Sequence, residues 1–205
     1  MKAAMVCGPS SSITSASIWD DAYLNLVRSF DTSWADINIG NYYAQYMDHD
    51  VTLLLDDRNR PIYAWRGETR VAPESEAAFT RDALPLVLKI RARERQRPVA
   101  SKAPPLVAFE ALLTASGVVK SGGAVYLTGA STIVPETTEV TQLDRPTVIV
   151  LSAKRMDRGF LVSLKDDLRI QDAAIAGGAA DARGSSTLPI IDVHGRTIGA
   201  LNWRP

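Results

Sequence analysis

The sequence is poor in the residue types that most often identify a chemistry. Its 205 residues include one cysteine, Cys7, and two histidines, His49 and His194. A single cysteine excludes a disulfide framework within the chain and could at most link two chains. Cysteine usage therefore leaves the cellular compartment undecided.

An excess of one charge and a long apolar run are also missing. The 23 basic and 23 acidic residues cancel, so no global field would attract the chain to nucleic acid or to an anionic membrane. No window approaches the roughly 18 to 20 apolar residues that cross a bilayer. The apolar stretch within residues 1–7 is shorter than the roughly 7 residues that the apolar part of a signal peptide needs. We expect a folded domain with neither a membrane-spanning helix nor a lipoprotein anchor.

No catalytic motif is legible in the sequence. Gly122-Gly123 and Thr128-Gly129 lack the Lys-Ser/Thr that follows in a phosphate-binding loop. Asp48, His49 and Asp50 are metal-ligand types, but three adjacent residues rarely point at one ion, and the other histidine lies in an expected turn. We therefore expect no catalytic residue, no metal and no cofactor.

Aromatic residues and aspartates are concentrated between residues 19 and 65. Trp19, Tyr23, Leu26 and Phe30 recur on one helical face, which predicts a helix over residues 12–28 with serines at its start. A second helix is predicted over residues 34–47. Its glycine and asparagines each lower helix propensity by up to about 1 kcal/mol relative to alanine, so tertiary contacts must hold it.

Two segments at opposite ends of the chain share a turn pattern. Residues 56–64 and 192–200 carry Asp, then Asn or Gly, Arg, Ile and Ala at the same offsets. Asn and Gly tolerate the positive φ of tight turns. The pattern predicts two antiparallel hairpins.

The remaining pattern predicts alternating helices and strands. A helix is expected over residues 74–97, beginning at or kinking near Pro85, with the basic run at 89–97 forming a solvated face at its C-terminus. Proline and glycine punctuation separates the later segments. These are strands at 106–113, 123–133 and 147–152, a short helix at 158–168 and a mobile loop at 173–186.

Several short motifs resemble those of a known family. They are W-D-D-A-Y at 19–23, W-A-D and N-I-G between 34 and 40, an Asp-rich turn before R-P-I-Y-A-W at 60–65, and the closing segment 195–205. Together they resemble the fourth family of CHASE domains, the extracytoplasmic sensing modules of bacterial membrane-bound histidine kinases and diguanylate cyclases. The middle of the chain, residues 72–120, matches that family only in its helix-then-strand layout.

The resemblance implies an α+β fold in which an N-terminal helix precedes a PAS-like or Cache-like, mostly antiparallel sheet with covering helices. It implies one sensor domain over 1–205, with a helical segment at 1–47 and a sheet core at 48–205. The parent protein would carry a transmembrane helix on each side, absent from this chain, and would place the domain on the periplasmic face of the inner membrane. The domain would not be an enzyme, would dimerise through its N-terminal helix, and would serve two-component or cyclic di-GMP signalling.

A ligand site would lie between the sheet and its covering helices in such a module. An aspartate beside aromatic rings can hold a cationic ligand group, with cation–π attraction of roughly 0.5 to 2 kcal/mol. We predict that an unknown small molecule is bound by Trp19, Asp20, Tyr23, Tyr63, Trp65 and Tyr126.

Other interpretations remain open at this point. The aromatic residues can instead form core, and Asp20 can cap a helix or pair with an arginine such as Arg60 or Arg66. The domain would then be a ligand-free dimerisation or relay module. A small secreted hydrolase that uses Asp20 or Asp21 as acid or base is a further alternative.

Overall fold

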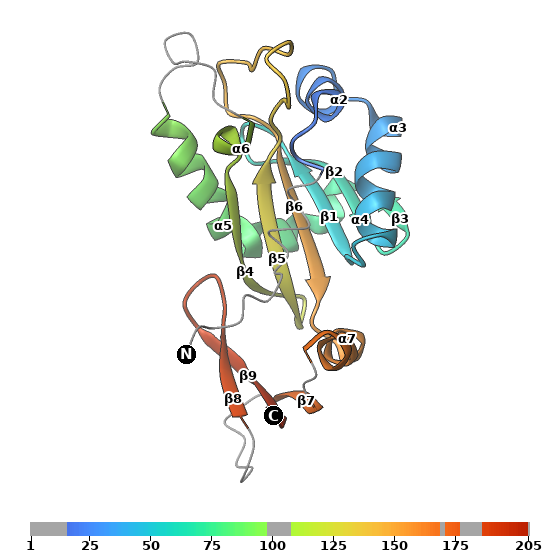
Figure 1. Ribbon diagram of the computed structural model, residues 1–205, viewed down its shortest axis with the longest axis vertical. Helices are drawn as coiled ribbons and strands as arrows, with labels where there is room; N and C mark the ends of the chain where they lie inside the picture. The colour runs from blue at the N-terminus through green and yellow to red at the C-terminus, as the bar shows by residue number, and fades with distance from the viewer. Residues whose placement is uncertain (1–15, 98–107, 169–170, 177–185, 205) are drawn as a thin grey trace.

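The computed structural model describes residues 16–97, 108–168, 171–176 and 186–204. It confirms the α+β prediction, with helices first and then an antiparallel sheet of six strands in the order β3-β2-β1-β6-β5-β4 (Figure 1). Every pair of neighbours in this sheet is antiparallel. Its strands are β1 (Val51–Leu55), β2 (Pro61–Arg66), β3 (Thr69–Val71), β4 (Thr114–Ser121), β5 (Ala124–Thr132) and β6 (Ile149–Arg155).

The six-stranded sheet has helices on both faces because its strands are apolar on both sides. In β1, Leu53 and Leu55 belong to the core cluster under helix α5 (Ala77–Arg95), whereas Leu54 belongs to the cluster under the N-terminal helices. Side chains alternate between the two faces of a strand. Burial on both faces explains why β1 is a continuous apolar run rather than an alternating one.

The first predicted helix is shorter than expected. Residues 16–19 form a turn and an isolated bridge between Ile18 and Val134, and the helix begins only at Asp20. It consists of α2 (Asp20–Tyr23) and the π-helical η1 (Leu24–Arg28). Residues 1–15, including the serines expected to cap it, lie outside the described residues.

The second predicted helix is confirmed with its bounds shifted by two residues. It runs through α3 (Thr32–Ala35), the π-helical η2 (Asp36–Asn41) and α4 (Tyr42–Gln45). The tertiary contact that its sequence required lies at Gly40. A Cβ there would come within 2.4 Å of ring carbons of Trp65 and 2.3 Å of the Tyr63 hydroxyl. Only glycine lets the helix approach the sheet this closely.

Helix α5 follows a 3-10 turn, η3 (Pro73–Glu76), and contains Pro85 within it. Pro85 is thus not the start of the helix. The strand predicted at 106–113 is wrong where the residues are described, since they form the short α6 (Ala108–Ala111) and β4 starts at Thr114. The strands near 123–133 and 147–152 are confirmed as β5 and β6, and the helix at 158–168 as α7 (Arg158–Leu168).

A second, three-stranded sheet was not predicted. It has the order β7-β9-β8, from β7 (Gln171–Ala176), β8 (Ser186–Ile191) and β9 (Thr197–Arg204). The loop expected at 173–186 is therefore wrong for residues 173–176, which pair with β9. Val193, in the β8–β9 turn, packs against the α5 side of the large sheet, and its N–H donates to the Val118 carbonyl at 2.9 Å.

The two predicted hairpins are confirmed, and their turns share one set of bonds. In each, the aspartate accepts hydrogen bonds from the backbone N–H groups two and four residues later and pairs with an arginine guanidinium. The pairs are Asp56 with Arg60 and Asp192 with Arg196. The residue before each arginine has positive φ, 62° at Asn59 and 79° at Gly195. The sequence echo therefore reflects a repeated turn structure.

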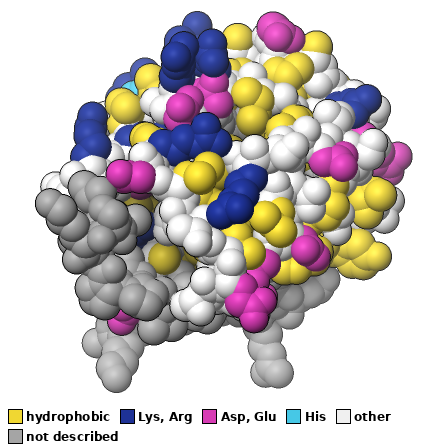
Figure 2. All heavy atoms as spheres, turned by 90° about the horizontal axis from the view of Figure 1, so that it is seen from above, with side chains coloured by type: hydrophobic (Ala, Val, Ile, Leu, Met, Phe, Trp, Pro, Cys, Tyr) yellow, Lys and Arg dark blue, Asp and Glu magenta, His cyan; other side chains and the backbone are white. Residues whose placement is uncertain are grey.

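Basic and acidic side chains are interspersed with hydrophobic ones on the end of the molecule seen in Figure 2. No single sign of charge dominates that face, as expected from the equal numbers of basic and acidic residues in the sequence. Among the helices of the described ranges, none is both long and apolar enough to cross a membrane.

Candidate functional site

A groove of about 370 Å³ lies where the N-terminal helices meet the edge of the large sheet. One wall comes from Phe30 and Thr32, at the junction of η1 and α3. The other comes from β2, β3 and the segment that leads into η3. The lining residues there are Ile62, Tyr63, Ala64, Arg70, Val71, Ala72 and Pro73. The volume suits a small organic molecule.

Tyr63 is the predicted site residue that lines this groove. Its ring is buried and lies 6.4 Å from the ring of Phe30, centroid to centroid. Its hydroxyl donates to Asp36 at 3.1 Å. Burial, together with the neighbouring Asp36 carboxylate, raises the pKa of Tyr63. The phenol is therefore a hydrogen-bond donor at all ordinary pH values.

Asp36 connects the helix wall of the groove to the strand wall. It accepts the Tyr63 hydrogen bond on one oxygen and an ion pair from Arg70 on the other, at 2.9 Å. Arg70 lies on β3 and Asp36 begins η2. Asp36, Tyr63 and Arg70 thus form a polar triad beside apolar walls, in which Tyr63 is buried and the two charged side chains are partly exposed.

Trp65 lies on the same face of β2 as Tyr63, two residues along the strand, and is half-buried. Its indole N–H donates to the Gly67 carbonyl at 2.9 Å, and its ring meets Gly40 of η2. Trp65 therefore fixes the helix against the sheet beside the groove rather than lining it.

Trp19, Asp20 and Tyr23 lie together, away from the groove. Trp19 is 36% exposed, and its ring lies 5.2 Å from that of Trp34. The Asp20 carboxylate accepts hydrogen bonds from the Thr137 hydroxyl and from the N–H groups of Thr137 and Glu136. The hydrogen bond from the Thr137 hydroxyl, above all, lowers the pKa of Asp20. This carboxylate therefore holds the loop after β5, a structural role different from the helix cap or arginine pair that was the alternative.

The two arginines named as possible partners of Asp20 pair with other carboxylates. Arg60 pairs with Asp56, and Arg66 with Glu76. Tyr23 is fully buried and accepts a hydrogen bond from the Leu143 N–H at 2.7 Å. Asp20 and Tyr23 therefore both anchor the segment between β5 and β6 to the N-terminal helices.

Tyr126 lies on the opposite face of the sheet, with the core cluster under α5. Its ring packs edge-on against Phe79, with centroids 5.2 Å apart. Both line a smaller cavity of about 210 Å³, along with the ion pair of Arg66 and the buried Glu76. The sheet thus separates Tyr126 from Trp19, Asp20, Tyr23, Tyr63 and Trp65.

His49 is buried between the N-terminal helices and the sheet. Its Nδ1 lies 2.6 Å from Ser152 Oγ, and its ring stacks on Tyr43 at 5.6 Å. Burial, and next the charge of Lys154, lowers its pKa to about 4. No set of three or more potential metal ligands comes together within the described ranges. His49 therefore belongs to the packing of the first helices on β1 and β6.

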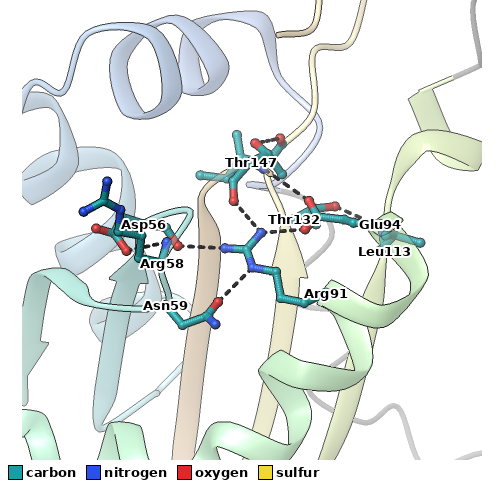
Figure 3. A network of polar contacts seen from close by, with 9 residues as sticks. Asp56, Arg58, Asn59, Arg91, Glu94, Leu113, Thr132 and Thr147 are labelled. Carbon is teal, nitrogen blue, oxygen red and sulfur yellow. Dashed lines mark hydrogen bonds and ion pairs between the residues drawn. The ribbon is translucent and has the colours of Figure 1, made fainter. Parts of the chain in front are cut away.

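The sequence predicted that the basic run 89–97 forms a solvated face. This is wrong for Arg91, which is buried. Figure 3 shows its guanidinium between the first hairpin turn and the start of β6. It donates to Asn59 Oδ1 and to the carbonyls of Asp56 and Thr147, and it pairs with Glu94. Four acceptors compensate for the cost of burying the charge. This network holds α5 and does not reach either cavity.

Of the nine residues that line the groove, only Tyr63 had been predicted as a site residue, and Thr32, Arg70 and Phe30 are among those missed. Thr32 stands in the break between the two predicted helices, and Arg70 on a strand that was not predicted. Phe30 was recognised only as the end of the aromatic stripe. The signal that could have found Arg70 is the alternation in T-R-V after the Gly67 turn, which indicates a third short strand.

Chemically, the groove combines apolar surface with a few polar groups. It offers two aromatic rings, aliphatic side chains, the hydroxyls of Thr32 and Tyr63, and one guanidinium. The arrangement suits recognition of a small molecule.

A comparison with protein families agrees with this reading. The family model described as "CHASE4 domain" matches residues 10–175, which is most of the chain. The match includes the whole six-stranded sheet and ends before β8. No curated protein matches the chain.

Proposed function

Because the chain belongs to the CHASE4 family, whose members are non-catalytic extracytoplasmic sensing domains of signalling receptors, we propose that it binds its signal molecule in the groove between the N-terminal helices and strands β2 and β3. The observation that carries this proposal is the groove itself. Its walls come from two separate parts of the chain, and it presents Tyr63 and Arg70, two donors of the polar triad, beside apolar surface.

A ligand in this position would contact both walls at once. One wall belongs to the helices at residues 20–45 and the other to the edge of the sheet. A ligand shifts the balance between two signalling conformations only by its different affinity for each. A ligand that bridges both elements supplies such a difference when the two conformations place the elements differently.

The finer parts of the proposal concern the parent receptor. The domain would occupy 1–205, with its helical segment at 1–47 and its sheets at 48–205, on the outer face of the bacterial inner membrane. Membrane helices outside this chain would carry the signal to a histidine kinase or a diguanylate cyclase. The N-terminal helices would form the homodimer contact, for which exposed Ile37 and Tyr46 supply apolar surface.

A ligand-free relay remains a second candidate, and one observation favours it. Both faces of the large sheet are filled by side chains, including Tyr23, Trp65 and Tyr126 of the predicted site. A module that only transmits motion needs no more than such packing. The groove at the sheet edge is what distinguishes the sensing proposal from this one.

Thermal unfolding of the 205-residue chain against amino acids, amines, carboxylates, nucleobases and divalent metals tests the proposal. A ligand at 100 times its dissociation constant adds about 2.7 kcal/mol, or roughly 5 to 11 °C at this size. The groove-filling variant Ala72→Trp should abolish the shift. Ala72 is an exposed rim residue, so the larger side chain fills the groove without entering the core.

Ala78→Trp is the matched control, because Ala78 is equally exposed and lines the smaller cavity instead. A shift lost in Ala78→Trp but kept in Ala72→Trp would move the site to the Tyr126 side of the sheet. No shift with any compound would instead support the relay.

A further inference from the structure

The groove contains a single charged side chain, and that charge is positive. Arg70 lines it, and its other lining residues are apolar or carry a hydroxyl. A site with one cation beside aromatic and aliphatic walls complements a molecule with one negative group and an apolar body. An amine would meet the guanidinium with like charge and be disfavoured.

Arg70 already has a partner that a ligand could replace. It pairs with Asp36 at 2.9 Å, and the side chains of Arg70 and Asp36 are 50% and 31% exposed. Ion pairs exposed to this extent contribute little to stability, because water screens them. A bound carboxylate, shielded by the groove walls, would interact more strongly with the guanidinium through two parallel hydrogen bonds.

Asp36 would not be left without a donor by that exchange. Its other oxygen accepts the hydroxyl hydrogen bond of Tyr63 at 3.1 Å. The exchange therefore breaks one contact between η2 and β3, and the contact between Asp36 and β2 remains. It loosens the helix from the outermost strand alone.

Building on the proposed function, we propose that the ligand is a small monocarboxylate with an aromatic or branched aliphatic body, whose carboxylate takes the place of Asp36 on Arg70. The apolar body of the ligand lies against Phe30, Val71 and Pro73, and the buried Tyr63 also lines the groove. A phosphate monoester fits less well, since its charge near −2 would face one cation with the Asp36 carboxylate close by.

Isothermal titration with matched sets of compounds tests this inference. The sets are phenylacetate, phenylacetamide and 2-phenylethylamine, and isovalerate with isovaleramide. For the 205-residue chain, at least one carboxylate should bind ten or more times more tightly than its amide, and the amine should not compete. Arg70→Gln should weaken the carboxylate at least tenfold and leave the amide unchanged.

Two further variants separate recognition from a merely structural effect. Asp36→Asn removes the competing charge but keeps an oxygen for Tyr63, so carboxylate binding should become tighter by several fold. Arg58→Gln removes an exposed arginine of the first hairpin and should leave binding unchanged. A structural role for the Arg70–Asp36 pair would make Asp36→Asn weaken binding instead.

The possible failures are distinct. Equal or tighter binding of the amide or amine, or no binding by either carboxylate, overturns the carboxylate inference. The sensing function survives that result if another compound still binds in a manner that Ala72→Trp abolishes. It fails together with the inference if no compound of the wider panel binds in the groove.

Discussion

The imidazole of His49 lies in an environment that disfavours its charged form. The residue is 7% exposed, its ring stacks on Tyr43, and Lys154 adds positive charge nearby, while Asp48 acts in the opposite direction. Burial lowers the His49 pKa from 6.5 to about 4. The fold therefore keeps this histidine neutral over a range in which the unfolded chain protonates it.

This lowered pKa predicts a loss of stability in mild acid. Between pH 6.5 and about 4 the unfolded state binds more protons, so the free energy of unfolding falls as pH falls, by roughly 3 kcal/mol in all. His49→Phe should remove this pH dependence while keeping a ring on Tyr43. Urea unfolding at a series of pH values measures it.

His194→Phe is the control, since it removes the other histidine of the chain. The carboxylates with lowered pKa, Asp20, Asp56 and Asp192, titrate below this window. An unchanged pH dependence in His49→Phe would show that another group causes it.

At this scale the sequence predicted residue types better than residue roles. It drew attention to Asp20 and Tyr23, yet their partners Thr137 and Leu143 lie more than a hundred positions away, so no local pattern reveals the anchored loop. Tyr63 was singled out as aromatic. Its donation to Asp36 depends on how the second helix packs on β2, which spacing along the chain does not encode.

Helix α5 is held by a polar network around the buried Arg91. Its basic C-terminal run predicted a solvated face, and Lys89, Arg93 and Arg95 are indeed exposed. Arg91 lies on the inner side and joins the helix to the turn after β1 and to the start of β6. Arg91 follows Ile90 directly, so it lies about 100° around the helix from that buried residue. At that angle the sequence alone does not decide whether Arg91 faces the core or the solvent.

Arg91→Met should destabilise the protein by roughly 2 to 4 kcal/mol. The variant keeps the buried aliphatic volume but leaves Glu94 without its cation and the Thr147 carbonyl without its donor, while the Asp56 carbonyl keeps the Asn59 N–H. Arg91→Lys should also be destabilising, since an ammonium cannot reach the same four acceptors in a plane. Urea unfolding at pH 7 measures both.

Arg95→Met on the same helix provides the comparison, because Arg95 is exposed. Its effect should stay within about 0.5 kcal/mol. Similar losses in Arg91→Met and Arg95→Met would mean that the network of Figure 3 contributes little.

The elements themselves were predicted unevenly, for physical reasons. Both hairpins were found because Asp, Asn or Gly, and Arg specify the turn locally. Strands β3, β4 and β7 were missed or misplaced. β3 has three residues, and β7 is an Ala-rich segment without the alternation that marks a strand. β3 and β4 pair with the strands next to them in the sequence, β2 and β5, whereas β7 pairs with β9, beyond β8.

For the whole molecule, the main question is whether the two sheets unfold together. Val193 of the β8–β9 turn packs on the α5 side of the large sheet, and a Cβ at Gly117 would lie 2.8 Å from it. His194 Nε2 lies 3.2 Å from the Asp82 carbonyl of α5. All of these contacts are made by the β8–β9 turn. We therefore expect this turn to couple the unfolding of the two sheets.

We predict one cooperative unfolding transition for the chain, consistent with a single domain. Val193→Ala should lower its midpoint, with a loss of roughly 1 kcal/mol for the two missing methyl groups and an unchanged denaturant dependence. Urea unfolding followed by both fluorescence and far-ultraviolet circular dichroism measures this. Non-coincident curves would show that the small sheet unfolds separately.

The close contact between Trp19 and Trp34 offers an optical consequence. Their rings lie 5.2 Å apart at an interplanar angle of 49°, a geometry in which the excited states of two indoles couple. Trp34 stands two residues after Thr32 of the groove wall, on the same short helix, and Trp19 precedes α2. A displacement of one helix relative to the other would change the exciton signal of the indole pair, so the unlabelled protein carries its own spectroscopic reporter of movement at the groove.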